Sequence, residues 1–181
     1  MRAKLIMAIA AVMCLTLAGA EEKNLLVNPG FEDGSWRGGP TSWNVTYGNW
    51  KIVDGGLENS KALEVSSVNV PEHKKIKISF VQAIDNPVMG KYLLKGNLKG
   101  EFTEVLTVLS SPKMEPQVTV LKKDQCPQKD GWNSFEVKSS IPEGAGTVSM
   151  VIEVWTEKEG VPVLFDNISL QLVGGVDAGG K

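Results

Sequence analysis

Histidine and cysteine are scarce in this sequence, which contains one histidine and two cysteines. Triad-type catalysis needs a histidine beside a nucleophile, and zinc sites need clustered histidines or cysteines. The single histidine, His73, lies among polar residues just before a predicted strand, and no motif pairs it with a nucleophile. We interpret it as a surface-loop residue. A glycine-rich phosphate-binding loop is missing as well, so the sequence contains no motif for nucleotide binding.

An excess of charge of one sign is also lacking, because 19 basic residues stand against 21 acidic ones. Without a basic stripe, nucleic acid is not an expected partner. The only long apolar run, Leu5–Leu17, follows Arg2 and Lys4 and precedes a small-residue segment ending at Ala20. This order is typical of a signal peptide, and the run is too short to span a membrane. We therefore predict a signal peptide over residues 1–20, cleavage after Ala20, and a secreted or periplasmic protein.

Removal of the signal peptide leaves Cys126 as the only cysteine, so an intramolecular disulfide is excluded. The polar residues around Cys126 indicate a loop and favour an exposed thiol. The remaining length suits one domain with its own core. No linker or internal repeat is visible, so we predict one domain over residues 21–173. The glycine-rich end, residues 174–181, is expected to be a flexible tail.

The sequence after residue 20 indicates an all-β domain. Apolar and polar residues alternate in several short runs, as in Lys75–Phe80 and Thr147–Trp155, which is the period of a strand with one buried face. Glycine, proline and asparagine turns separate about ten such runs, and no segment keeps a helical period. Many short strands with turns between them are typical of a β-sandwich.

Two motifs at opposite ends of this domain carry a resemblance to a known family. The first is Asn24–Gly34, with the sequence NLLVNPGFEDG, and the second is Val163–Leu170, with the sequence VLFDNISL. Together they resemble the opening and closing strands of secreted carbohydrate-binding modules of the CBM4/9/16/22-like, or galactose-binding-like, group. The resemblance implies a jelly-roll β-sandwich and a carbohydrate ligand, and it leaves the identity of the ligand open.

The same resemblance implies a metal site. In these modules, acidic residues at the positions of Glu32 and Asp166 often hold a structural calcium ion together with backbone carbonyls, and calcium favours such oxygen ligands. We therefore treat Glu32 and Asp166 as candidate ligands of a structural Ca²⁺. The alternative is that both carboxylates accept hydrogen bonds from backbone amides in turns.

Aromatic residues are the best candidates for sugar contacts, because the C–H faces of sugars stack on aromatic rings. The sequence contains five tryptophans. We expect Trp43 and Trp132 in the core, and Trp50 shares a strand face with an isoleucine, which also suits the core. In Thr147–Trp155 the alternation directs Trp155 outward together with Glu153. Trp155 is therefore a candidate sugar platform; the alternative is a strand-end tryptophan folded against a loop.

Further candidate contacts come from loops and other strands. Trp36 lies in a glycine-rich loop and is expected either to cover the core or to contact the ligand, because loops often carry binding residues. Tyr47 lies near a turn. Asn97 points outward by alternation and is a candidate polar partner of Trp155, together with Glu153. The candidate carbohydrate-binding residues are therefore Trp155, Trp36, Tyr47, Glu153 and Asn97.

The sequence thus predicts a secreted, non-catalytic, carbohydrate-binding β-sandwich, acting alone or with a separate enzyme or surface complex. Two alternatives remain open. One is a structural or adhesive surface protein that keeps the fold without a sugar site. The other is a small glycoside hydrolase or lyase, which would need two carboxylates close together in a cleft. Binding assays with and without detection of product would separate the three.

Overall fold

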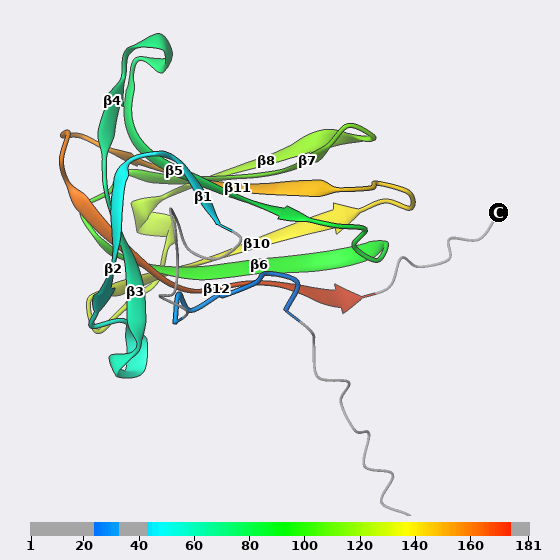
Figure 1. Ribbon diagram of the computed structural model, residues 1–181, viewed down its shortest axis with the longest axis horizontal. Helices are drawn as coiled ribbons and strands as arrows, with labels where there is room; N and C mark the ends of the chain where they lie inside the picture. Colours follow the sequence, from blue (N-terminus) through cyan, green and yellow to red (C-terminus); the bar gives the residue numbers. More distant parts are fainter. Residues whose placement is uncertain (1–23, 33–42, 175–181) are drawn as a thin grey trace, which may run out of the picture.

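The computed structural model describes residues 24–32 and 43–174, which form two packed antiparallel β-sheets (Figure 1). We name the sheets after their strands β5 and β6. The β5 sheet has the order β1-β5-β11-β7-β8, and β4 also pairs with β5. Its strands are β1 (Asn44–Tyr47), β4 (Val68–Val70), β5 (Lys75–Ile84), β7 (Glu104–Ser111), β8 (Met114–Lys122) and β11 (Val148–Thr156).

The β6 sheet has the order β2-β3-β12-β6-β10-β9. Its strands are β2 (Asn49–Asp54), β3 (Lys61–Ser66), β6 (Gly90–Gly100), β9 (Gln128–Lys129), β10 (Trp132–Ile141) and β12 (Pro162–Gly174). Three short 3-10 turns complete the described part of the chain: η1 (Leu57–Asn59), η2 (Pro71–His73) and η3 (Lys123–Gln125). This part of the chain contains no α-helix. The predicted all-β sandwich is confirmed. Nothing helical in this part of the chain is long and apolar enough to cross a membrane.

The alternation of apolar and polar residues positions the core between the sheets. In β11, every second residue from Val148 to Val154 is fully buried, while the residues between them are partly exposed. Four aromatic rings then connect the layers: Phe31 and Trp43 have centroids 6.0 Å apart, Trp43 and Phe80 5.3 Å, and Phe80 and Phe165 4.8 Å. Because Phe165 belongs to β12 and Phe80 to β5, this aromatic chain joins both sheets.

The two ends of the domain lie side by side, as Figure 1 shows for the blue N-terminal segment and the red strand β12. The backbone N–H of Leu25 donates to the carbonyl of Leu170 at 2.9 Å, and that of Ile168 donates to the carbonyl of Pro29 at 2.9 Å. The first and last motifs therefore pair with each other, as expected for the opening and closing strands of the predicted sandwich.

A side-chain amide joins the two sheets at the β8 edge. The amide nitrogen of Gln117, in β8, donates to the carbonyl of Ser140 in β10, and the backbone N–H of Ser140 donates back to Oε1 of Gln117 at 3.0 Å. This bidentate contact satisfies backbone groups that an edge strand would otherwise leave unpaired.

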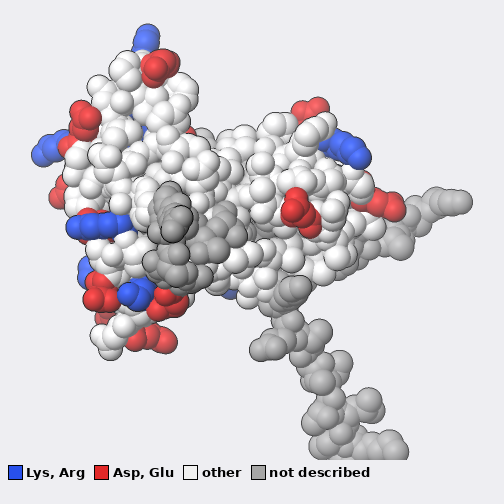
Figure 2. Space-filling model, viewed as in Figure 1, with Lys and Arg blue, Asp and Glu red and all other residues white. Residues whose placement is uncertain are grey.

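The face of the molecule in Figure 2 carries charges of both signs, which lie close together at the end formed by β2, β3 and β4. On this face no sign dominates, in agreement with the balanced composition.

Candidate functional site

A polar and aromatic cluster lies on the outward face of the β5 sheet. In the antiparallel register, Trp155 of β11 lies opposite Lys77 of β5, and Glu153 lies opposite Ser79. On the other side of β5, Tyr47 of β1 also lies opposite Ser79. Because side chains on one face of a sheet recur every second residue, these five side chains share the outward face. We name them, with Lys75 and His73, the Trp155 cluster.

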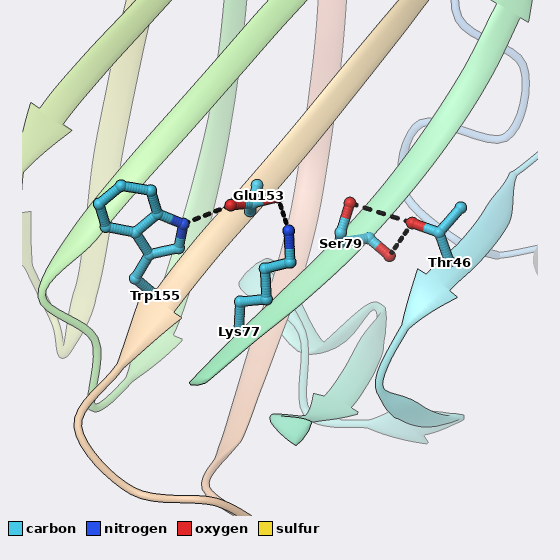
Figure 3. Close-up of polar contacts among 5 residues, drawn as sticks. All are labelled: Thr46, Lys77, Ser79, Glu153 and Trp155. Carbon is cyan, nitrogen blue, oxygen red and sulfur yellow. Dashed lines mark hydrogen bonds and ion pairs between the residues drawn. The ribbon is translucent and has the colours of Figure 1, made fainter. Parts of the chain in front are cut away.

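The carboxylate of Glu153 organises this cluster (Figure 3). The indole N–H of Trp155 donates to its Oε1, and Nζ of Lys77 lies 2.7 Å from its Oε2. Beside them, the hydroxyl of Thr46 donates toward Ser79, with 3.0 Å between the two hydroxyl oxygens. Each oxygen of the carboxylate therefore has its own partner, which fixes the orientation of the Trp155 ring relative to the strand.

Cations contact both aromatic rings of the cluster. Nζ of Lys75 lies 3.7 Å from the ring centroid of Trp155, and Nζ of Lys77 lies 4.7 Å from that of Tyr47. The Tyr47 ring also meets the edge of His73, with centroids 5.9 Å apart and planes at 69°. Such cation–π contacts stabilise a ring in one position. Trp155 and Tyr47 remain partly exposed, so a ligand can reach them.

The charged pair at the centre of the cluster is unusually buried for an outward face. The side chain of Lys77 is 5% exposed and that of Glu153 is 14% exposed. Taking two charges out of water costs free energy that the ion pair often fails to recover, so a buried pair is weak support for stability as its purpose. We interpret the pair as a device that positions Trp155.

Apolar side chains cover the part of the same face beyond the cluster. Four valines on neighbouring strands lie opposite one another and form a row across the sheet. The row consists of Val81, Val151, Val108 and Val118. Leu106 and Val120 lie in the next such row toward Trp155. Val118 and Val120 are 57% and 44% exposed. The outward face of the β5 sheet therefore combines a polar aromatic end with an apolar strip.

The structure brings together three of the five predicted carbohydrate-binding residues, Trp155, Glu153 and Tyr47. Trp36 lies outside the described residues, as do the predicted signal peptide and residues 175–181. Asn97 is in β6, opposite Ser134, on the outward face of the other sheet. Asn97 points outward as predicted, but the expectation that it is a polar partner of Trp155 is corrected, because the two side chains lie on opposite faces of the sandwich.

The predictions for buried residues have mixed outcomes. Trp43 is buried in the core as predicted. Trp132 is 5% exposed, but it shares the outward side of β10 with Ser134, and Nζ of Lys99 lies 5.8 Å from its ring centroid. Trp132 is therefore buried on the outer side of the β6 sheet and not in the core between the two sheets. Cys126 is 3% exposed, so the expected exposed thiol is wrong.

Glu32 and Asp166 lie close together, and they accept hydrogen bonds from the β2–β3 loop and the start of β3. Oε1 of Glu32 accepts from the N–H of Lys61 at 2.9 Å. Oδ2 of Asp166 accepts from the N–H of Leu57 at 2.7 Å and from the hydroxyl of Ser60 at 2.9 Å. Burial raises the pKa of the Asp166 carboxyl, hydrogen bonds oppose this effect, and the neighbouring Glu32 adds to it. The alternative of carboxylates bonded to turn amides is therefore realised.

The donor set also fits a calcium ion in part. A Cβ built on Gly30 would lie 3.7 Å from Oδ1 of Asp166 and 3.6 Å from Oδ1 of Asn167, with Cγ of Glu32 also at 3.7 Å. A carboxylate oxygen and an amide oxygen thus converge beside Gly30, and calcium prefers oxygen ligands of these kinds. Within residues 24–32 and 43–174, no three acidic, histidine or cysteine residues cluster as a metal site, so a calcium ion here would rely on amide or carbonyl oxygens.

Several solved structures share this fold. TmCBM61, solved in complex with β-1,4-galactotriose, has a TM-score of 0.60 and 18% identity over 82% of this chain and 97% of its own. The CBM22-1 xylan-binding domain from Paenibacillus barcinonensis Xyn10C has a TM-score of 0.57 and 11% identity over 86% and 97%. The protein has the β-sandwich fold of carbohydrate-binding modules. The predicted resemblance is confirmed at the level of the fold.

Enzymes share the same fold. A cyclase from Fischerella sp. TAU, in complex with 4-(1H-indol-3-yl)butan-2-one, has a TM-score of 0.62 and 12% identity over 84% of this chain and 98% of its own. No family model and no curated protein matches the sequence. At these identities the likeness concerns the fold, so the chemistry must be argued from the residues of this chain.

Sequence reasoning missed Lys77 and Ser79 as members of the site. The alternation in Lys75–Phe80 does place them on the polar face of their strand, but it does not identify the neighbouring strand. The register of β5 with β11 supplies that information, since it sets Lys77 beside Trp155. A lysine that alternates with isoleucines was the available signal.

Proposed function

We propose that this protein is a secreted, non-catalytic module that binds carbohydrate at the Trp155 cluster. The observation that carries the proposal is the orientation of the Trp155 ring by Glu153, whose carboxylate is itself held by Lys77. A partly exposed ring fixed in position suits stacking against a sugar face, and preorganisation lowers the entropic cost of binding. Charged and hydroxyl groups beside the ring can bond sugar hydroxyls.

The position of Lys75 defines how the ligand would enter. Its ammonium group covers one face of the Trp155 ring, and Lys75 itself is exposed and has a flexible side chain. A stacked sugar would displace this ammonium group, which can then donate to a ring or hydroxyl oxygen of the ligand. Tyr47 and His73, on the other side of Lys77, would form a second contact for a longer saccharide.

A second candidate function is protein docking by a structural or adhesive module. The apolar strip that ends at the exposed Val118 and Val120 favours protein docking. A row of valines offers no hydrogen-bonding groups to the hydroxyls of a sugar. Contiguous exposed apolar surface commonly marks interaction sites. The strip and the Trp155 cluster lie on the same face, so a single assay with several ligand classes can separate the two functions.

The test is a glycan array and a polysaccharide pull-down with residues 21–181, followed by chromatography of the supernatant for released products. The proposal expects binding of at least one saccharide, no product, and at least tenfold weaker binding by Trp155→Ala than by Trp155→Phe, which keeps a ring. Absence of binding to every glycan would favour the docking function. Release of shorter products would contradict the non-catalytic part of the proposal.

Export and calcium complete the proposal. We propose cleavage after Ala20 and secretion, supported by the charged and apolar order of residues 1–20. Mass spectrometry of the exported protein tests this, and a different N-terminus or a lipid-modified Cys14 would contradict it.

We also propose that Glu32 and Asp166 hold a structural Ca²⁺ that does no chemistry, supported by the convergence of oxygen atoms beside Gly30.

A further inference from the structure

A separate cleft lies on the outward face of the β6 sheet, opposite the Trp155 cluster. It encloses about 390 Å³. Its floor is the cross-strand pair Asn97 and Ser134, and its two walls are the β2–β3 loop at residues 56–59 and the β9–β10 turn at residues 129–132. Trp132 lines it from the second wall. We name this the Asn97 cleft.

The first wall of the Asn97 cleft is fixed by the buried Asp166 carboxylate. Asp166 lies opposite Asn97 in the sheet and accepts hydrogen bonds from Leu57 and Ser60, so the loop is fastened over the strand. The approach is close enough to require glycine at position 56. A Cβ added to Gly56 would lie 2.6 Å from Oδ2 of Asp166 and 2.4 Å from a backbone carbonyl. The wall is therefore preorganised.

Both walls contain backbone in the left-handed region. Glu58 and Asn59 have φ angles of 55° and 64° in the first wall, and Asp130 has a φ angle of 53° in the second. Asparagine and aspartate tolerate this conformation, but glutamate gains nothing locally from it. Such conformations persist where the surrounding structure imposes them, and they gather at ligand-binding sites.

Polar side chains surround the cleft. Oδ1 of Asn97 accepts from the Ser134 hydroxyl at 3.0 Å, while its amide nitrogen donates to no group in the described part of the chain. The side chains of Glu58, Asn59, Lys129 and Asp130 are exposed and likewise have no hydrogen-bond or ion-pair partner within residues 24–32 and 43–174. Amide donors, carboxylate acceptors and an ammonium group thus face one space.

The balance of these groups indicates the class of ligand. Two carboxylates, of Glu58 and Asp130, stand against two ammonium groups, of Lys129 and the nearby Lys99. A site for an anion or a metal ion would have an excess of one sign, which this cleft lacks. Sugar hydroxyl groups need both donors and acceptors, and the Trp132 side chain, which is 5% exposed, adds a small apolar contact at the second wall. The volume lies at the small end of the range for ligand pockets, about 300–1,000 Å³.

We infer that the Asn97 cleft is a second saccharide site, which takes a neutral sugar of one or two residues. It lies on the outer face of the sandwich opposite the Trp155 cluster, so one straight polysaccharide chain cannot occupy both. Two sites on opposite faces allow the protein to bridge two glycan chains, and simultaneous engagement would raise the apparent affinity for a dense glycan surface.

The experiment is a titration of ¹⁵N-labelled protein, residues 21–181, followed by the indole N–H signals of Trp132 and Trp155 and the side-chain amide of Asn97. The probes are D-galactose, D-xylose and D-glucose and their β-1,4-linked disaccharides. We expect at least one probe to shift the Trp132 and Asn97 signals saturably, both in the unmodified protein and in Trp155→Ala. In Asn97→Leu the affinity at this cleft should fall at least tenfold, while Asn49→Leu, at an exposed position at the far end of β2, should leave it unchanged.

The outcomes separate this inference from the proposed function. If no probe shifts the Trp132 and Asn97 signals, or if the Trp132 shift persists with unchanged affinity in Asn97→Leu, the second site is wrong. If the shifts disappear in Trp155→Ala, there is one site and the inference is also wrong. Shifts confined to Trp155 would leave the proposed function standing without the second site, and shifts confined to Trp132 and Asn97 would do the reverse.

Discussion

Nζ of Lys77 lies 2.7 Å from Oε2 of Glu153 on the outward face of the β5 sheet, although the Lys77 side chain is only 5% exposed. The Trp155 indole donates to the other oxygen of the same carboxylate. A lysine, a carboxylate and an indole are therefore joined across two neighbouring strands. Because one carboxylate holds both the ammonium group and the indole N–H, the three side chains form one unit.

Removing one charge of this unit should be costly. Lys77→Met leaves the Glu153 carboxylate without its cation, and we expect the free energy of unfolding to fall by about 2–4 kcal/mol, because broken buried pairs typically cost about 3–5 kcal/mol. The double variant Lys77→Met/Glu153→Leu should recover more than half of this loss. Urea unfolding measures both. Lys51→Met is the control, since the Lys51 side chain is 64% exposed in its pair with Glu64, and such a surface pair is worth about 0–1 kcal/mol. Equal losses for Lys77→Met and Lys51→Met would contradict the account.

Two tryptophans should respond differently to truncation. Trp43→Ala removes a ring from the aromatic chain of the core and should lower stability by about 3–5 kcal/mol. Trp155→Ala removes a partly exposed ring, so we expect a loss of about 1–2 kcal/mol, within the usual range for point substitutions, together with at least tenfold weaker glycan binding. Thermal unfolding and a binding assay on the same samples distinguish them. A Trp155→Ala protein that unfolds as early as Trp43→Ala would show that the ring serves the fold.

The position of Trp155 could be predicted because it depends on one strand alone. Alternation in β11 fixes which residues point outward once one of them is known to be buried. The direction of Asn97 was predicted by the same argument. Its neighbours were not, because the order of strands in the two sheets depends on contacts between residues far apart in the sequence. Asn97 therefore belongs to a cleft with Ser134 and not to the Trp155 cluster.

The burial of Cys126 and of Lys77 is the other property that the sequence did not reveal. Cys126 follows a 3-10 turn in a polar segment, yet it is buried, and its carbonyl accepts from the Asn133 side chain at 3.1 Å. Lys77, in strand β5, is buried although it is charged, because Tyr47 of β1 and Glu153 of β11 lie against its ammonium group. The polar neighbours of Cys126 and the charge of Lys77 favoured exposure, whereas the burial of both residues depends on contacts with other segments.

The burial of Cys126 predicts that its thiol reacts slowly with alkylating reagents and that the thiol makes stability depend on pH. Burial, followed by the charge of Asp124, raises the pKa of this thiol, and the thiolate is the reactive form. Iodoacetamide should therefore modify the folded protein at least tenfold more slowly than the urea-unfolded protein at pH 8. The unfolded thiol ionises near pH 8.5, while the folded one stays protonated to higher pH. Stability should thus decline above about pH 8.5 through this group, and the decline should be smaller in Cys126→Ala. Equal alkylation rates in both states would contradict the burial.

Calcium should stabilise the fold through Glu32 and Asp166. The two carboxylates repel each other, and burial together with this repulsion raises the pKa of Asp166, so a bound cation would relieve an existing penalty. A ligand that binds only the folded state adds RT ln(1 + [L]/Kd), about 2.7 kcal/mol at a hundredfold excess over Kd. We expect a higher melting temperature in calcium than in chelator, and no difference between the two conditions in Asp166→Ala. Asp54→Ala is the control, because the Asp54 carboxylate is exposed and lies 3.8 Å from the Lys61 ammonium group, and this variant should keep the full shift. Identical melting curves of the unmodified protein with calcium and with chelator would refute the site, and the two carboxylates would then serve the β2–β3 loop alone.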